Sequence, residues 1–179
     1  MTSTPLIPRA QVHEWILDIE RNKSGHKNAI NLLLTRQRNL SRYVHKSAGE
    51  IQLGSRRAVL FIQGALLRVF DLAGGKVSKI TTENISDAQT RVGEVIPTLL
   101  PVDDSFVERM RSVEWRAQPH ILDECVVSLF DDPDLDREQM VRLFLLAWIV
   151  VEAANDSWSP PEDFEGETAY TLQPIDNLT

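Results

Sequence analysis

A block of basic residues near the start of the chain is the feature best suited to chemistry. Residues 21–57 carry nine Lys and Arg residues and a single acid, Glu50. If residues 26–46 form one helix, a rotation of about 100° per residue gathers several basic side chains within a sector of roughly 60°. The members of this stripe are Lys27, Arg38, Arg42 and His45, with Lys46 at its edge. Such a stripe can bind phosphates or carboxylates, so these residues are the predicted binding site.

The sequence leaves three interpretations of this stripe open: a solvated helix face, a surface for an acidic protein region, or a nucleic-acid-binding surface. The charge distribution disfavours the nucleic-acid interpretation. Residues 1–82 carry 13 Lys and Arg against 5 Asp and Glu, whereas residues 83–179 carry 6 against 21. The acidic half would repel a long polyanion, and the pI near 5.1 is low for a dedicated nucleic-acid-binding domain.

A second candidate for chemistry is a group of residues around His120. His120 and Glu124 stand four residues apart with Asp123 beside them, so one turn of helix could supply two metal ligands. The pattern lacks the second histidine of zinc-binding helices and a clear third ligand downstream. A metal-dependent enzyme around His120 is therefore a lesser alternative, and we expect the histidine to be solvated in the first turn of an exposed helix.

Other catalytic signatures are weak. Acids at alternate positions in residues 131–136 resemble half of a calcium loop, but its midway glycine and closing glutamate are missing, so helix capping explains them better. The single cysteine, Cys125, sits in an apolar stretch and fits an inert buried thiol. We expect no catalytic residue, no metal and no cofactor.

Hydrophobic periodicity predicts a mostly α-helical protein, a compact bundle of about six helices. Ser86 is the expected cap of one helix and Pro97 its end. Residues 55–72 favour a further helix that Gly74-Gly75 would end, with a small β-hairpin within residues 57–82 as the alternative. The expected helices span residues 8–21, 26–46, 86–97, 103–115, 119–130 and 134–154.

The last of these helices is apolar on nearly every face, which requires burial on most sides. We expect it to form the centre of the core, with Leu145 and Trp148 deeply buried; cover by a second subunit is the alternative. The longest apolar run, from Leu143 to Val151, is far shorter than the ~20 residues that span a bilayer. With one cysteine and no secretory signal visible at the N-terminus, we expect a soluble cytoplasmic protein without membrane association.

The composition changes after residue 156, where tandem prolines precede a run of acids. We expect a helical domain over residues 1–156 and an acidic, proline-containing tail over residues 157–179 that is loosely packed. Truncation after Asn155 should then leave a folded domain. Trp158 and Phe164 are costly to expose, however, which favours some docking of the tail.

These patterns favour a non-enzymatic interaction or regulatory protein, in which the basic N-terminal helix face and the acidic C-terminal half engage different partners. A protein partner is expected. A nucleic-acid-binding regulator that uses the basic helix over residues 26–46 is the main alternative, and a homodimer is left open.

Overall fold

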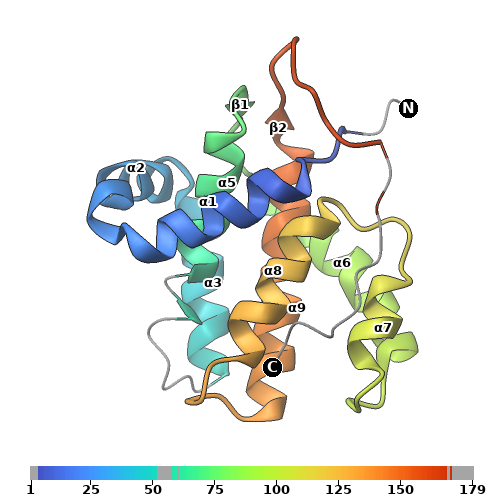
Figure 1. The fold of residues 1–179 in the computed structure, drawn as a ribbon. Helices are drawn as coiled ribbons and strands as arrows, with labels where there is room; N and C mark the ends of the chain where they lie inside the picture. The colour runs from blue at the N-terminus through green and yellow to red at the C-terminus, as the bar shows by residue number, and fades with distance from the viewer. Residues whose placement is uncertain (1–3, 52–57, 60, 169, 171–179) are drawn as a thin grey trace.

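The computed structural model describes residues 4–51, 58–59, 61–168 and 170, and this part of the chain is mostly α-helical, as predicted (Figure 1). It contains eight α-helices, one π-helix and a single two-stranded sheet. None of the described helices is long and apolar enough to cross a membrane. The α-helices are α1 (Arg9–Arg21), α2 (Lys23–Arg36), α3 (Arg38–Glu50), α5 (Leu66–Leu72), α6 (Thr82–Leu99), α7 (Phe106–Arg111), α8 (Pro119–Phe130) and α9 (Arg137–Asp156).

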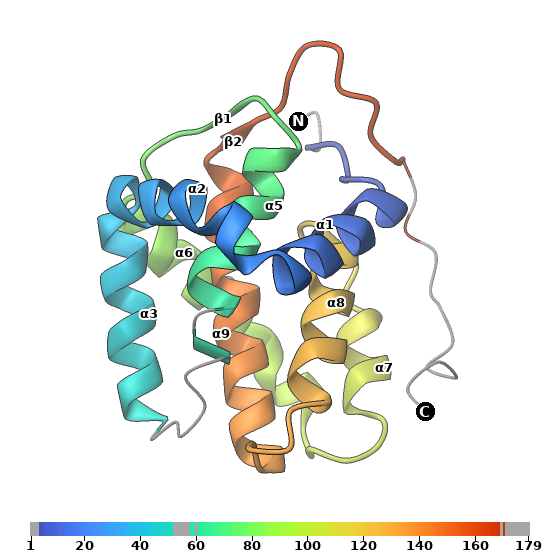
Figure 2. The ribbon, with the colours of Figure 1, turned by 60° about the vertical axis from the view of Figure 1, so that its left-hand side comes forward.

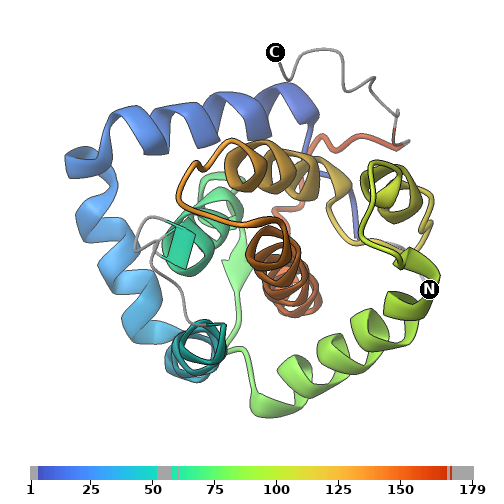
Figure 3. The ribbon, with the colours of Figure 1, turned by 90° about the horizontal axis from the view of Figure 1, so that it is seen from below.

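Helix α9 lies near the centre of the molecule, with α5 and α8 beside it and α1, α2, α3, α6 and α7 around them (Figure 3). Trp148 is fully buried, so the predicted core helix is confirmed, and helices of the same chain cover it. Leu145, expected to be deeply buried, is only partly buried. It shares one stripe of α9 with the exposed residues Glu138 and Arg142, because residues three and four apart lie on the same side of a helix.

Reciprocal capping bonds start the two longest helices. At α9, the Asp136 side chain accepts the Gln139 N–H at 2.9 Å, and the Gln139 side chain accepts the Asp136 N–H at 3.0 Å. At α6, Thr81 and Asn84 exchange the same pair of bonds. Helix α6 therefore begins at Thr82, and the predicted cap Ser86 lies inside it.

The extents of the other helices follow the predictions unevenly. Helices α1 and α8 match theirs closely, whereas α6 continues through Pro97 to Leu99. Helix α7 is much shorter than the predicted span of residues 103–115. The Arg116 guanidinium bonds to the carbonyls of Arg111 at 2.7 Å and Val113 at 2.9 Å, and these contacts hold the chain in an irregular path after α7.

The predicted helix over residues 26–46 is two helices, α2 and α3, which meet at Gln37. This side chain is buried and donates to the Ser78 carbonyl at 3.0 Å and accepts the Ile80 N–H at 2.9 Å. The Gln37 backbone, with φ −101° and ψ 49°, leaves the helical region. Contacts with a distant segment therefore break a helix that periodicity alone predicts to be continuous.

Residues 58–59 and 61–72 are helical, as the sequence favours for this segment. A π-helix, η1 (Phe61–Ala65), leads into α5, and Gly74 and Gly75 follow with φ 84° and 74°. Strand β1 (Lys76–Val77) then pairs antiparallel with β2 (Trp158–Ser159), so its partner comes from the C-terminal segment rather than from residues 57–82. The predicted start of this helix, residues 55–57, lies outside the described residues.

The C-terminal segment packs on the helical body as far as it is described. The Trp158 side chain is buried, donates its indole N–H to the Gly74 carbonyl at 2.9 Å and packs edge-on against Phe70. Further along, Glu167 pairs through its backbone with Leu6. A boundary near residue 156 stays a prediction, but these contacts tie both sides of it together.

Candidate binding surface

Four of the five predicted binding residues lie together on helix α3: Arg38, Arg42, His45 and Lys46. Their spacing places them on one side of the helix, and all four are exposed. The opposite side of α3 buries Leu40, Val44 and Ala48. We call Arg38, Arg42, His45 and Lys46 the basic face. Helix α3 runs along one side of the molecule, with α7 and α8 on the other (Figure 2).

Lys27, the fifth predicted residue, lies on α2, beyond the break at Gln37. The prediction of one continuous stripe is wrong in this respect, because the break changes the direction of the chain between Lys27 and Arg38 (Figure 1). Lys27 is exposed like the others.

The basic face differs from most arginines of residues 83–179 in its lack of acidic partners among the described residues. Among the described residues, none of its four side chains forms an ion pair. The arginines of the acidic half are mostly paired: Arg91 with Asp156 at 2.7 Å, Arg109 with Asp103 at 2.8 Å, Arg111 with Asp123 at 3.0 Å, Arg137 with Asp104 at 2.9 Å and Arg142 with Glu138 at 2.6 Å. The charge of the basic face is therefore available to an external anion.

The start of α3 is held in place from outside the helix. Besides the two bonds of Gln37, the Asn39 side chain donates to the Ile80 carbonyl at 3.3 Å. Arg38 lies between these two anchored residues. The basic face therefore stands on a fixed element, so that binding need not order the backbone beneath it.

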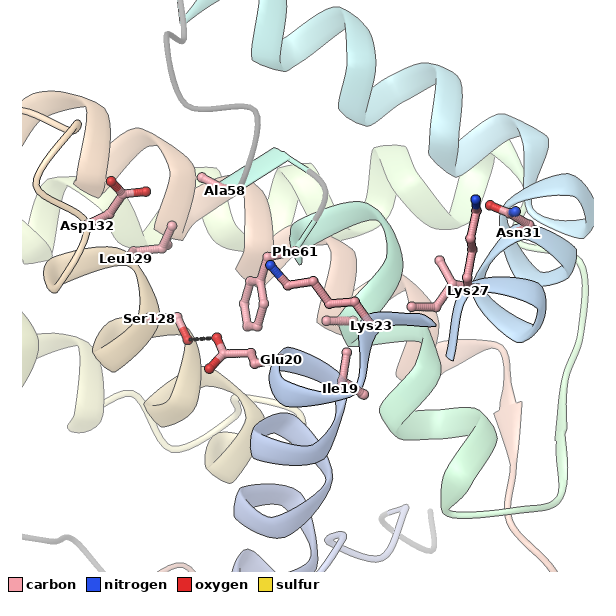
Figure 4. Close-up of a pocket in the computed structure, with 12 residues that line it drawn as sticks. Ile19, Glu20, Lys23, Lys27, Asn31, Ala58, Phe61, Ser128, Leu129 and Asp132 are labelled. Carbon is pink, nitrogen blue, oxygen red and sulfur yellow. Dashed lines mark hydrogen bonds between the residues drawn. The ribbon is translucent and has the colours of Figure 1, made fainter. Parts of the chain in front are cut away.

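A cavity of about 710 Å³ opens beside Lys27, between α1, α2, η1 and α8 (Figure 4). Lys23 and Lys27 reach it from α2, and Phe61 lies between these lysines and Asp132 on the far side. Glu20 of α1 accepts a hydrogen bond from the Ser128 hydroxyl of α8 at 3.4 Å. Sequence reasoning missed this cavity, because its walls come from segments far apart in the chain.

The residues around His120 each bond to a different partner. His120 is buried, which contradicts the expected solvated position, and its Nε2 lies 2.6 Å from Glu167 Oε2. Asp123 bonds to Arg111, and Glu124 bonds to His13 at 2.9 Å. Within the described residues, no group of three His, Cys, Asp or Glu side chains is placed to hold a metal ion. His120 instead anchors the C-terminal segment.

Two other titratable side chains, Cys125 and Glu152, are buried and have raised pKa values. Burial raises the pKa of the Cys125 thiol, with Glu124 and Asp123 adding to the effect, so the thiolate is disfavoured. Burial also raises the pKa of Glu152. Neither side chain lines the cavity.

The chain matches no known protein family, no curated protein and no solved structure. The fold and the surface together define a mostly α-helical protein whose basic face is exposed and without acidic partners in the described part of the chain. The functional argument therefore depends on these residues and their surroundings.

Proposed function

We propose that this is a non-enzymatic interaction or regulatory protein whose basic face binds an acidic polypeptide segment of a partner protein. The observation that carries the proposal is the combination of exposure and lack of ion pairs with described residues at Arg38, Arg42 and Lys46. Carboxylates accept charge-assisted hydrogen bonds from such side chains, with two parallel bonds where arginine is the donor.

Two observations favour an acidic polypeptide over nucleic acid. The molecule is acidic overall, and its second half, with 21 acids against 6 Lys and Arg, repels a long polyanion more than a short acidic segment. In addition, α2 and α3 are joined by the single residue Gln37, whereas a helix-turn-helix unit has a turn of about three or four residues. A partner's acidic segment needs to contact only α3.

The test is fluorescence anisotropy with a labelled oligoglutamate peptide of roughly twelve residues, at about 0.15 M salt, where screening acts beyond about 8 Å. We expect saturable binding that weakens about tenfold or more in the Arg38→Glu/Arg42→Glu variant. The matched control is Arg137→Glu/Arg142→Glu on exposed positions of α9, which changes the net charge equally. The affinity of this control for the peptide should change less than about twofold, because both positions lie on α9 and outside the basic face. Exposed ion pairs contribute little to stability, so the control should still fold.

The other outcomes contradict the proposal. Equal weakening in both double variants would show that only net charge matters. A DNA duplex that binds at micromolar concentration or tighter, and is lost in Arg38→Glu/Arg42→Glu, would establish the nucleic-acid alternative. In that case, Arg38→Ala with Arg42→Ala should reduce the slope of log K against log salt by roughly two. No binding of the peptide at all would also refute the proposal.

A further inference from the structure

The cavity between α1, α2, η1 and α8 has the dimensions of a small-molecule site. Its volume, about 710 Å³, falls within the range of about 300–1,000 Å³ that is typical of ligand pockets. It opens beside the N-terminal half of α2, whereas the basic face lies on α3. The cavity and the basic face can therefore be tested separately.

One part of the cavity wall is apolar. Ile19 of α1, Ile30 of α2 and Leu129 of α8 contribute to it, and η1 adds Phe61 and Ala65. These two residues stand at the two ends of the single π-helical turn, and π-helical turns are frequent at functional sites. Phe61 projects into the middle of the cavity (Figure 4). This wall suits an alkyl chain.

The α2 side of the cavity is cationic. Lys23 and Lys27 are four residues apart and therefore lie on the same side of α2, and both are exposed. Neither forms an ion pair with a described residue. Two acids also line the cavity, and each accepts a hydrogen bond: Glu20 from Ser128, and Asp132 from the Asp134 N–H at 3.0 Å.

We propose that this cavity binds an amphipathic anion, namely a carboxylate that carries an unbranched alkyl chain. The carboxylate bonds to the ammonium group of Lys23, which points toward Phe61, while Lys27 adds positive charge on the same side of α2 (Figure 4). The chain lies against Phe61 and its apolar neighbours. Charge complementarity at the two lysines and the apolar surface around Phe61 select this class of ligand over a neutral lipid or a small hydrophilic anion.

Isothermal titration calorimetry with three probes tests the ligand class. Dodecanoate carries both chemical features, dodecanol lacks the charge, and acetate lacks the chain. We expect one molecule of dodecanoate to bind with an affinity about tenfold or more above that of either other probe. Equal affinity for dodecanoate and dodecanol would refute the role of the lysines, and the absence of saturable dodecanoate binding would refute the site.

Three variants locate the binding. Lys23→Ala/Lys27→Ala should weaken dodecanoate binding about tenfold, whereas the control Lys76→Ala/Lys79→Ala, which removes two exposed lysines near β1, should leave it unchanged. Ser128→Trp, which fills the cavity from α8, should abolish binding. Unchanged binding in Ser128→Trp would place the ligand elsewhere and overturn the proposal. If circular dichroism shows that Ser128→Trp does not fold, the surface lysine variants decide whether dodecanoate binds in the cavity.

This inference does not depend on the function proposed for the basic face. Ser128→Trp should still bind the oligoglutamate peptide, and Arg38→Glu/Arg42→Glu should still bind dodecanoate. Loss of one activity without the other therefore identifies which of the two proposals has failed.

Discussion

Replacement of Glu152 tests how the centre of the bundle is held together. This side chain is only 3% exposed and lies on α9. Its Oε1 accepts the Trp148 indole N–H at 3.0 Å and the Ala117 backbone N–H at 2.8 Å, while Arg91 of α6 approaches Oε2 at 3.4 Å. One carboxyl group therefore joins α6, α9 and the segment that precedes α8.

The expected magnitude follows from the donors that lose their acceptor. In Glu152→Ala, the Trp148 N–H stays buried without an acceptor, which costs about 1–3 kcal/mol. The partly exposed Ala117 N–H loses a bond with a net contribution of about 1 kcal/mol. The free energy of unfolding should thus fall by about 3 kcal/mol. Glu152→Gln keeps the oxygen that accepts both bonds, and Arg91 keeps Asp156, so its loss should be about 1 kcal/mol or less.

Urea denaturation at about pH 4.5 and at about pH 8 measures the loss of unfolding free energy in both variants. Burial raises the pKa of Glu152 in the folded protein, although the bonds from Ala117, Trp148 and Arg91 act in the opposite direction. The folded state therefore binds the proton more tightly than the unfolded state. The stability linked to this group is fully present below the unfolded pKa, about 4.3, and is lost as pH rises through the folded value. The difference in unfolding free energy between Glu152→Gln and the unchanged protein should be largest at about pH 4.5, where the variant is the less stable, and should shrink toward neutral pH.

Two results would refute this reasoning. Equal unfolding free energies for Glu152→Ala and Glu152→Gln at neutral pH would show that the bonds to Oε1 contribute nothing. A constant difference between Glu152→Gln and the unchanged protein from about pH 4.5 to 8 would contradict the raised pKa.

Two further predictions concern long-range ties. Gln37→Ala should lower the free energy of unfolding by about 2 kcal/mol, because the bonds to Ser78 and Ile80 are lost; thermal denaturation unchanged from the parent would contradict it. Truncation after Asn155 should lower it by about 3–5 kcal/mol, the usual effect of removing a buried tryptophan, since Trp158 is lost. A melting temperature equal to that of the full chain would restore the sequence-based expectation that the tail is dispensable.

Local signals explain the parts of the fold that the sequence predicts well. Helix α8 begins at the predicted Pro119 and ends at the predicted Phe130, and the apolar α9 occupies the core. Pro at a helix start and apolar residues on nearly every face are properties of short stretches of chain. For the same reason Arg38, Arg42 and their neighbours share a side of α3, as their spacing predicts.

Contacts between distant segments decide the parts of the fold and of the candidate site that the sequence does not predict. The predicted helix breaks at Gln37 because this side chain bonds to Ser78 and Ile80, which lie 41 and 43 residues further along the chain. This break separates Lys27 from the basic face. His120 is buried because Glu167, 47 residues further on, folds back over it. The sequence by itself determines helix periodicity and the distribution of charge. Only the tertiary structure decides which polar side chains find partners, because a hydrogen bond depends on the proximity of two groups in space and not on their distance along the chain.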